Sequence, residues 1–302
     1  MARTAEGGAQ PSTTEILRAV RRVQLRTRRT VTDMVAGGYR SVFRGSGMEF
    51  EEVREYVPGD DVRAIDWNVT ARTGRPYVKK FVEEREQTIF VALDVSASTR
   101  LGSGPRNVRQ AAAELAAILA FSAAESGDKS GLLLFSDEVE LELPPRTGTR
   151  QAFRITREAL YRQPLRTGTS VSLACDHLGR VLKRRAYVFL IGDFLDEGFE
   201  RPLGQLARRH DVVALRLVDG RHVALPAVGL VPWRDPETGG VMQVDTSSAR
   251  VRDAMARLAQ DRSARLRQLL LRRGVDLVDI EVGASVVEPL VAYLHQRERR
   301  LR

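Results

Sequence analysis

Apolar runs alternate with amphipathic stretches along most of the chain, and this alternation predicts its fold. From residue 88 onward, continuous runs of β-forming residues are typical of strands buried on both faces of a parallel sheet. The predicted strands are 88–93, 131–135, 186–191, 211–218 and 275–282, with 139–143 as the hairpin partner of the second. Helical periodicity covers 106–126, 150–161, 170–183, 200–209, 250–273 and 285–298. Strands that alternate with helices predict a doubly wound, mostly parallel α/β sheet with right-handed crossovers.

The part of the chain before residue 88 follows a different pattern. Residues 13–30 have helical periodicity, whereas residues 40–87 combine short β-like runs with two turn sequences, PGDD at 58–61 and TGRP at 73–76. We expect a small β-rich subdomain here, because its apolar residues are too many for a flexible linker. The predicted division of the chain is 1–11 disordered, 12–87 N-terminal helix and β-rich subdomain, and 88–302 α/β domain with a β insertion near 222–245.

The charge of the chain leaves binding to nucleic acid or to an anionic membrane surface open as alternatives without favouring them. Its 302 residues include 48 Lys and Arg against 39 Asp and Glu, a net charge of +9. The basic residues are spread along the chain, and aromatic residues, on which bases would stack, make up only 6%. The arginines at 18–29 share their segment with Val20 and Val23, which predicts an amphipathic helix with a solvated arginine face.

Cysteine content and hydropathy predict the cellular compartment of the protein. Cys175 is the sole cysteine, so an internal disulfide and a cysteine zinc cluster are both excluded. We expect it to be buried and inert. No apolar stretch is long enough to span a bilayer, and residues 1–15 lack the apolar core of a signal peptide. We therefore expect a cytoplasmic protein.

Candidate chemistry follows two of the predicted strands. Asp94, Ser96 and Ser98 come directly after the strand 88–93, and Asp193 follows the strand 186–191; Thr169 lies in a loop before a helix. In a doubly wound sheet, ligands bind at the carboxyl ends of the strands, so these side chains are expected to meet there. Their donors are all oxygens, which suit Mg²⁺ or Mn²⁺. The alternative is that Ser96 or Ser98 only caps the following helix.

These residues resemble the metal-ion-dependent adhesion site of von Willebrand factor A domains. That site has Asp-x-Ser-x-Ser after its first strand, a threonine in a later loop and an aspartate after a later strand. Asp94, Ser96, Ser98, Thr169 and Asp193 match these positions in the same order. The resemblance implies a von Willebrand factor A-like fold, with these five residues around one Mg²⁺ or Mn²⁺.

A second resemblance covers most of the chain. The stretch "GMEFEEVREYVPGDDVRAIDWNVTARTGRPYVKKFVEERE", which leads into "LDVSAS", and the later "LIGDFLD" are similar to the bacterial family called domain of unknown function 58. Members carry a von Willebrand factor A-like domain and are commonly encoded beside a MoxR-type AAA+ ATPase. Many carry N-terminal membrane spans, and because this sequence shows none we expect a cytosolic form.

These features predict a non-enzymatic, metal-dependent protein-interaction module. Hydroxyl ligands are neutral, so a bound Mg²⁺ would keep much of its charge and attract an Asp or Glu of a partner. The family resemblance implies an adaptor for a MoxR-type ATPase and an unknown client protein, in chaperone-like assembly or metal insertion.

The alternative function is a metal-dependent phosphoester hydrolase. Asp196 and the pair Asp60 and Asp61 could add acids to those of the candidate site, although we expect the pair to shape a turn. The four histidines are scattered without metal-ligand spacing. Trp67 is expected to close the small β-rich subdomain.

Overall fold

The computed structural model describes residues 13–34, 49–82, 86–100, 106–219, 226–234 and 239–301. The chain forms two compact units, one made of residues 1–42 and 88–302 and the other of residues 43–87. The predicted disordered segment 1–11 lies outside the described residues, as do parts of the β insertion. Among the helices that the structure describes, none is both long enough and apolar enough to cross a lipid bilayer.

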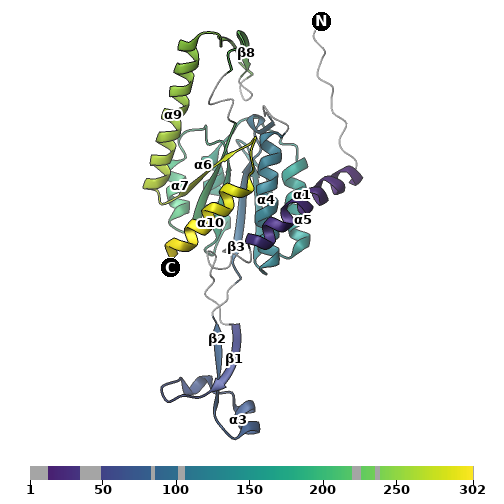
Figure 1. Ribbon diagram of the computed structural model, residues 1–302, viewed down its shortest axis with the longest axis vertical. Helices are drawn as coiled ribbons and strands as arrows, with labels where there is room; N and C mark the ends of the chain where they lie inside the picture. The colour runs from purple at the N-terminus through teal and green to yellow at the C-terminus, as the bar shows by residue number, and fades with distance from the viewer. Residues whose placement is uncertain are drawn as a thin grey trace. The chain divides into compact units, whose positions relative to one another are not determined.

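The larger unit is built on a six-stranded sheet with the spatial order β10-β7-β6-β3-β4-β5 (Figure 1). Its strands are β3 (Thr88–Asp94), β4 (Lys129–Phe135), β5 (Val139–Thr147), β6 (Tyr187–Gly192), β7 (Asp211–Val218) and β10 (Asp276–Glu281). All neighbours are parallel except β5, which pairs antiparallel with β4 through a short hairpin. The doubly wound, mostly parallel sheet is thus confirmed.

Helices cover both faces of this sheet (Figure 1). They are α1 (Thr13–Met34), α4 (Val108–Glu125), α5 (Thr149–Tyr161), α6 (Val171–Val181), α7 (Glu200–Ala207), α9 (Ala249–Arg272) and α10 (Val287–Leu301). On one face α4 is buried nearly all round, since it lies between the sheet and the helices α1 and α5. This explains its alanine-rich sequence, because small side chains allow close packing on every side.

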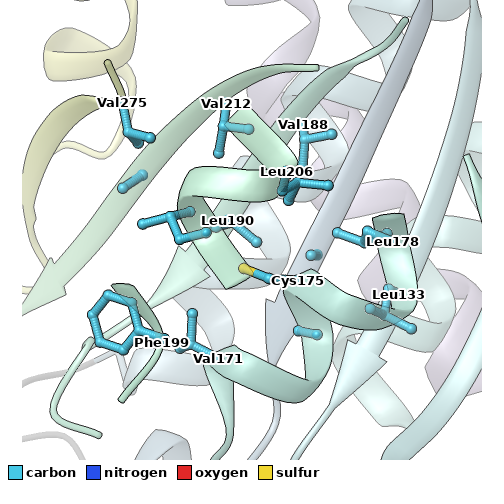
Figure 2. Packing of buried hydrophobic residues seen from close by; sticks show 14 of the residues in the cluster. Leu133, Val171, Cys175, Leu178, Val188, Leu190, Phe199, Leu206, Val212 and Val275 are labelled. Atoms are coloured by element: carbon cyan, nitrogen blue, oxygen red, sulfur yellow. The ribbon is translucent and has the colours of Figure 1, made fainter. Parts of the chain in front are cut away.

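The other face carries a core formed by β3, β4, β6 and β7 with α6, α7 and the end of α9. Figure 2 shows Cys175 of α6 among Leu190, Leu206 and Leu178. The cysteine is buried, and this burial raises the pKa of its thiol far above its usual value. Cys175 therefore acts as a small apolar core residue, as expected.

The insertion after β7 contains an antiparallel hairpin of β8 (Leu230–Arg234) and β9 (Val241–Asp245). Residues 220–225 and 235–238 of this insertion lie outside the described part of the chain. On α1, Arg18, Arg21 and Arg22 are exposed while Val20 is buried, which confirms an amphipathic helix.

The smaller unit contains a hairpin of β1 (Glu49–Glu55) and β2 (Tyr77–Val82), with a short helix α3 (Trp67–Thr73) in the connection. Asp66 caps α3 by accepting hydrogen bonds from the amides of Asn68 (3.0 Å) and Val69 (3.2 Å). The expectation for Trp67 was wrong: its side chain is 69% exposed, because the cap places it at the first, outward-facing position of α3.

We expect Asp66→Ala to loosen this unit. Loss of an N-cap costs about 1 kcal/mol, which corresponds to a roughly fivefold larger equilibrium constant for the opening of α3 and hence to faster amide exchange. Amide hydrogen exchange of α3 and β2 would measure this opening. The exposed Trp67→Ala is the control and should leave the exchange rates close to those of the wild type; equal rates in Asp66→Ala would contradict the capping role.

Candidate metal site

The candidate site lies where the strand order of the large sheet reverses. From β3 the chain proceeds to β4 and β5 on one side, whereas β6, β7 and β10 lie on the other side. The carboxyl ends of β3 and β6 therefore flank the position at which the connections diverge, which is where ligands bind in sheets of this kind. Asp94 is the last residue of β3, and Asp193 directly follows β6.

Asp94 is buried and fixed on both sides. Its Oδ1 accepts a hydrogen bond from the amide of Ser96 at 2.8 Å, and the Thr169 hydroxyl lies 3.4 Å from its Oδ2. The neighbouring strand leaves room for the carboxylate at Gly192, where a Cβ would come within 3.2 Å of the Asp94 Cβ. A side chain at position 192 would thus crowd the acid.

The two serines of the loop after β3 face one another. The hydroxyl oxygens of Ser96 and Ser98 are 3.0 Å apart. Neither serine caps the next helix, because Asn107 occupies the N-cap of α4 and forms a capping box with Gln110. The expectation of a serine cap on the helix α4 is therefore wrong, and the Ser96 hydroxyl instead lies against Ser98 and Asp94.

The loop that carries Thr169 is held in place from two sides. The amide of Ala97 donates to the Thr167 carbonyl at 2.9 Å, and the amide of Ser170 donates to the Ser136 carbonyl at 2.9 Å. These bonds join the loops after β3 and β4 to the loop before α6. Thr169 is thereby placed beside Asp94 although the two residues are far apart in the chain.

Glu140 organises the same loop and was missed in the sequence. It is buried on β5, where its carboxylate accepts hydrogen bonds from the Ser136 hydroxyl (2.8 Å) and from the amides of Leu165 (2.9 Å) and Arg166 (3.1 Å). Burial by itself raises the pKa of Glu140, but the hydrogen bonds outweigh it and leave the pKa below its usual value. The one signal in the sequence is an acidic residue at a buried strand position.

The loop after β6 is strained and tightly hydrogen-bonded. Asp193 accepts from the amide of Leu195 at 3.1 Å, and Asp196 accepts from the amide of Val171, at the start of α6, at 2.8 Å. Between them Phe194 has a φ of 55°, which is costly for a residue with a Cβ. Its burial against Phe199 offsets this cost.

The electrostatics of the site favour a cation. Burial, the nearby charge of Asp193 and, to a smaller extent, that of Asp196 raise the pKa of Asp94 from 3.8 to about 7, although hydrogen bonds from Ser96 act in the opposite direction. The acids thus repel one another in the protein alone. A divalent cation between them would reverse this repulsion.

The donor set fits a hard cation. Asp94 and Asp193 offer carboxylate oxygens, and Ser96, Ser98 and Thr169 offer hydroxyls, the donors that suit Mg²⁺ or Mn²⁺. Within the described ranges, no group of three or more His, Cys, Asp or Glu side chains could hold a metal ion. A cation at this edge would therefore depend on the hydroxyls.

Asp60 and Asp61 bind partners in or next to their own turn, and the described histidines lie in separate parts of the chain. Asp60 binds Arg54 and the amide of Val57, and Asp61 accepts from the amide of Arg63, so both shape the turn as expected. Among the described histidines, His177 contacts Glu142 at 2.7 Å, His295 lies 3.9 Å from Glu298, and His210 is buried next to the start of β7.

The fold defines an α/β protein of the von Willebrand factor A-like class, as the strand order, the antiparallel edge strand and the helices on both faces show. The family model described as "Protein of unknown function DUF58" matches residues 52–265. The chain belongs to this family.

The chain is similar to bacterial proteins and to solved structures. "Uncharacterized protein Rv1480" of Mycobacterium tuberculosis is 31% identical over 284 residues, which cover 93% of this chain and 89% of that protein. The structure of BatB from Bacteroides thetaiotaomicron, a "conserved hypothetical protein", matches with a TM-score of 0.49 and 17% identity. The match covers 71% of this chain and 98% of the BatB chain. A von Willebrand factor type A protein from Catenulispora acidiphila has a TM-score of 0.41 and 14% identity, and covers 72% of this chain and 43% of its own.

Proposed function

We propose that this protein is a non-enzymatic interaction module that binds one Mg²⁺ or Mn²⁺ and recognises a carboxylate of a protein partner through it. The observation that carries the proposal is that the hydroxyls of Ser96 and Thr169 lie against the buried Asp94, with the Ser98 hydroxyl 3.0 Å from that of Ser96, at the point where the strand order reverses. Ser96, Ser98 and Thr169 would hold the cation, with Asp94 and Asp193 as direct or water-mediated ligands. The cation would supply a positive charge for the partner's acid.

The finer proposal concerns the partner. We propose that this chain is an adaptor between a MoxR-type AAA+ ATPase and a client protein in chaperone-like assembly or metal insertion, as the family resemblance implies. A pull-down from native lysate with Mg²⁺, repeated with EDTA, tests this role. An ATPase that is captured only with Mg²⁺ supports it, whereas an ATPase captured equally with EDTA contradicts it.

Metal binding itself is tested by titration calorimetry with MgCl₂ and MnCl₂. We expect one site in the wild type and at least a tenfold loss of affinity in Ser96→Ala/Ser98→Ala, because the variant lacks two of three neutral ligands; loss of a supporting group alone already costs about 10–100-fold. The double variant Ser122→Ala/Ser126→Ala is the matched control, since these serines lie at the end of α4. Equal binding by all three proteins would refute the site.

Turnover would favour the alternative function, a metal-dependent phosphoester hydrolase. A panel of phosphoesters with purified protein and Mg²⁺ tests it. We expect no hydrolysis above the rate of Asp94→Asn, because the proposed role of the cation is to bind a carboxylate. If the wild type hydrolyses a phosphoester and Asp94→Asn does not, the protein is an enzyme and the proposed interaction module is wrong.

A further inference from the structure

Exposed apolar side chains gather at the edge of the sheet that carries the candidate site. Within the described residues of the larger unit, those that follow the carboxyl ends of β4, β6 and β7 or lie in the loop before α6 are Val139, Leu165, Leu195, Val228, Leu230, Val241 and Met242. Val139 belongs to this edge because it pairs with Phe135, the last residue of β4. Apolar exposure around a polar site is typical of a protein-interaction surface.

Two of these residues lie in the loops of the site itself. Leu165 is 81% exposed in the loop that leads to Thr169, and Leu195 is 53% exposed in the loop that begins at Asp193. Neither leucine packs into the core that its loop covers. Leu165 precedes the proposed ligand Thr169 in its loop, and Leu195 follows the proposed ligand Asp193.

Both leucines are displayed on a fixed backbone. The amide of Leu165 donates to Glu140 at 2.9 Å, and the amide of Leu195 donates to Asp193 at 3.1 Å. Burial of Phe194 at its positive φ turns the next side chain outward. An exposed apolar side chain on an ordered loop loses little entropy on binding, so its burial by a partner contributes most of its transfer free energy.

The charges beside the two leucines differ. Arg166 follows Leu165, and its side chain is 62% exposed at 3.6 Å from Glu138. Leu195 lies between Asp193 and Asp196. The positive charge that attracts a partner's acid therefore comes from the proposed cation, and each of the two loops adds an exposed apolar residue next to it.

We propose that Leu165 and Leu195 form the apolar part of the recognition surface, and that the partner segment which binds there is an Asp or Glu flanked by apolar side chains. The inference rests on the proposed function, which assigns the partner's carboxylate to the cation. The leucines bind the residues on either side of that carboxylate and so determine which acidic segments are accepted.

Four labelled peptides test this specificity by fluorescence polarisation in Mg²⁺. They have a central Glu or Gln, flanked on both sides by Leu or by Ser. We expect the wild type to bind the Leu-flanked Glu peptide about tenfold more tightly than the Ser-flanked one, as partial burial of two leucines provides. Leu165→Ser/Leu195→Ser should lose this preference. Leu271→Ser, which changes an exposed leucine at the end of α9 and thus at the opposite edge of the sheet, should retain it.

The outcomes separate this inference from the proposed function. If EDTA removes the preference for Glu over Gln while the flanks make no difference, the leucines are not part of the surface and the inference is wrong. If Glu and Gln bind equally in Mg²⁺ but the preference for Leu is lost in the double variant, the apolar surface stands and the cation does not recognise the acid. No measurable preference for Leu in the wild type, including no binding at all, overturns the inference.

Binding to phosphatidylglycerol vesicles tests a membrane surface as the alternative. If the wild type and Leu271→Ser bind the vesicles and the double variant does not, the leucines contact a membrane and the inference is wrong.

Discussion

Asp94→Asn is expected to weaken Mg²⁺ binding strongly and, in EDTA at pH 8, to stabilise the protein. The introduced amide keeps an oxygen for the Ser96 N–H and offers its own N–H to the Thr169 hydroxyl, whereas the buried negative charge is lost. The pKa of Asp94 is about 7 in the folded protein in place of 3.8. At pH 8 the buried charge therefore lowers the unfolding free energy of the wild type by up to about 4 kcal/mol. The affinity for Mg²⁺ should fall by at least about 10–100-fold.

The pH dependence gives the sign of this effect. Because the folded state holds the Asp94 proton more tightly than the unfolded state, this group stabilises the protein below about pH 4, and that stability is lost as the pH rises to about 7. Thermal unfolding in EDTA at pH 5 and pH 8 should therefore show the largest gain of the variant at pH 8. Mg²⁺ should raise the unfolding temperature of the wild type and leave that of the variant unchanged.

Two results would contradict this account. The first is a difference in unfolding temperature between Asp94→Asn and the wild type in EDTA that is the same at pH 5 and pH 8. It would mean that burial and the neighbouring acids do not raise the pKa of Asp94. A variant that retains the stabilisation by Mg²⁺ would place the cation elsewhere. Asp253→Asn, at an acid on α9 outside the site, is the control for a general effect of charge.

Glu140→Ala is expected to destabilise the protein by about 2–3 kcal/mol and to weaken Mg²⁺ binding. It leaves the amides of Leu165 and Arg166 without their buried acceptor, and lost hydrogen bonds to a charged group cost about this much. The loop that places Thr169 would then have more freedom. Chemical denaturation and calorimetry measure the two effects, and the difference in stability should shrink at acid pH, where Glu140 becomes protonated in the wild type.

Glu142→Ala is the matched control for this change. Glu142 is on the same strand and contacts His177, but its side chain is 32% exposed, so its loss should cost less than about 1 kcal/mol. If Glu140→Ala lowers stability without changing the affinity for Mg²⁺, Glu140 supports the fold and does not position the site. Equal stability of both variants would contradict its role as the acceptor that holds the loop.

Local sequence patterns were sufficient for most elements. The strand 211–218 has the predicted bounds, and the helix predicted over 250–273 is observed as Ala249–Arg272. Asp94 and Asp193 could be named because polar residues directly after buried strands must lie at the edge of the sheet. The metal at this site stays a prediction.

Other features could not be read locally. The cap of α4 is Asn107 and not a serine, because residues 97–100 form a separate turn of 3₁₀ helix before α4 begins. Trp67 lies outward because Asp66 begins a helix where the sequence indicated only β structure and turns. In both cases a short helix of a few residues has too little periodicity to be detected.

The order and type of the elements follow from the amino-acid pattern, since the repeat of apolar residues reports which side of a helix or strand is buried. The same pattern shows which oxygen-bearing side chains reach the edge of the sheet. The folded chain adds contacts that this pattern does not specify: β6 pairs with β3, the Thr169 hydroxyl, which was expected at this edge, lies 3.4 Å from Asp94, and Glu140 holds the loop that displays Leu165. They join distant parts of the chain, and they depend on strand pairing and on hydrogen bonds to backbone amides, which leave no periodic trace in the sequence.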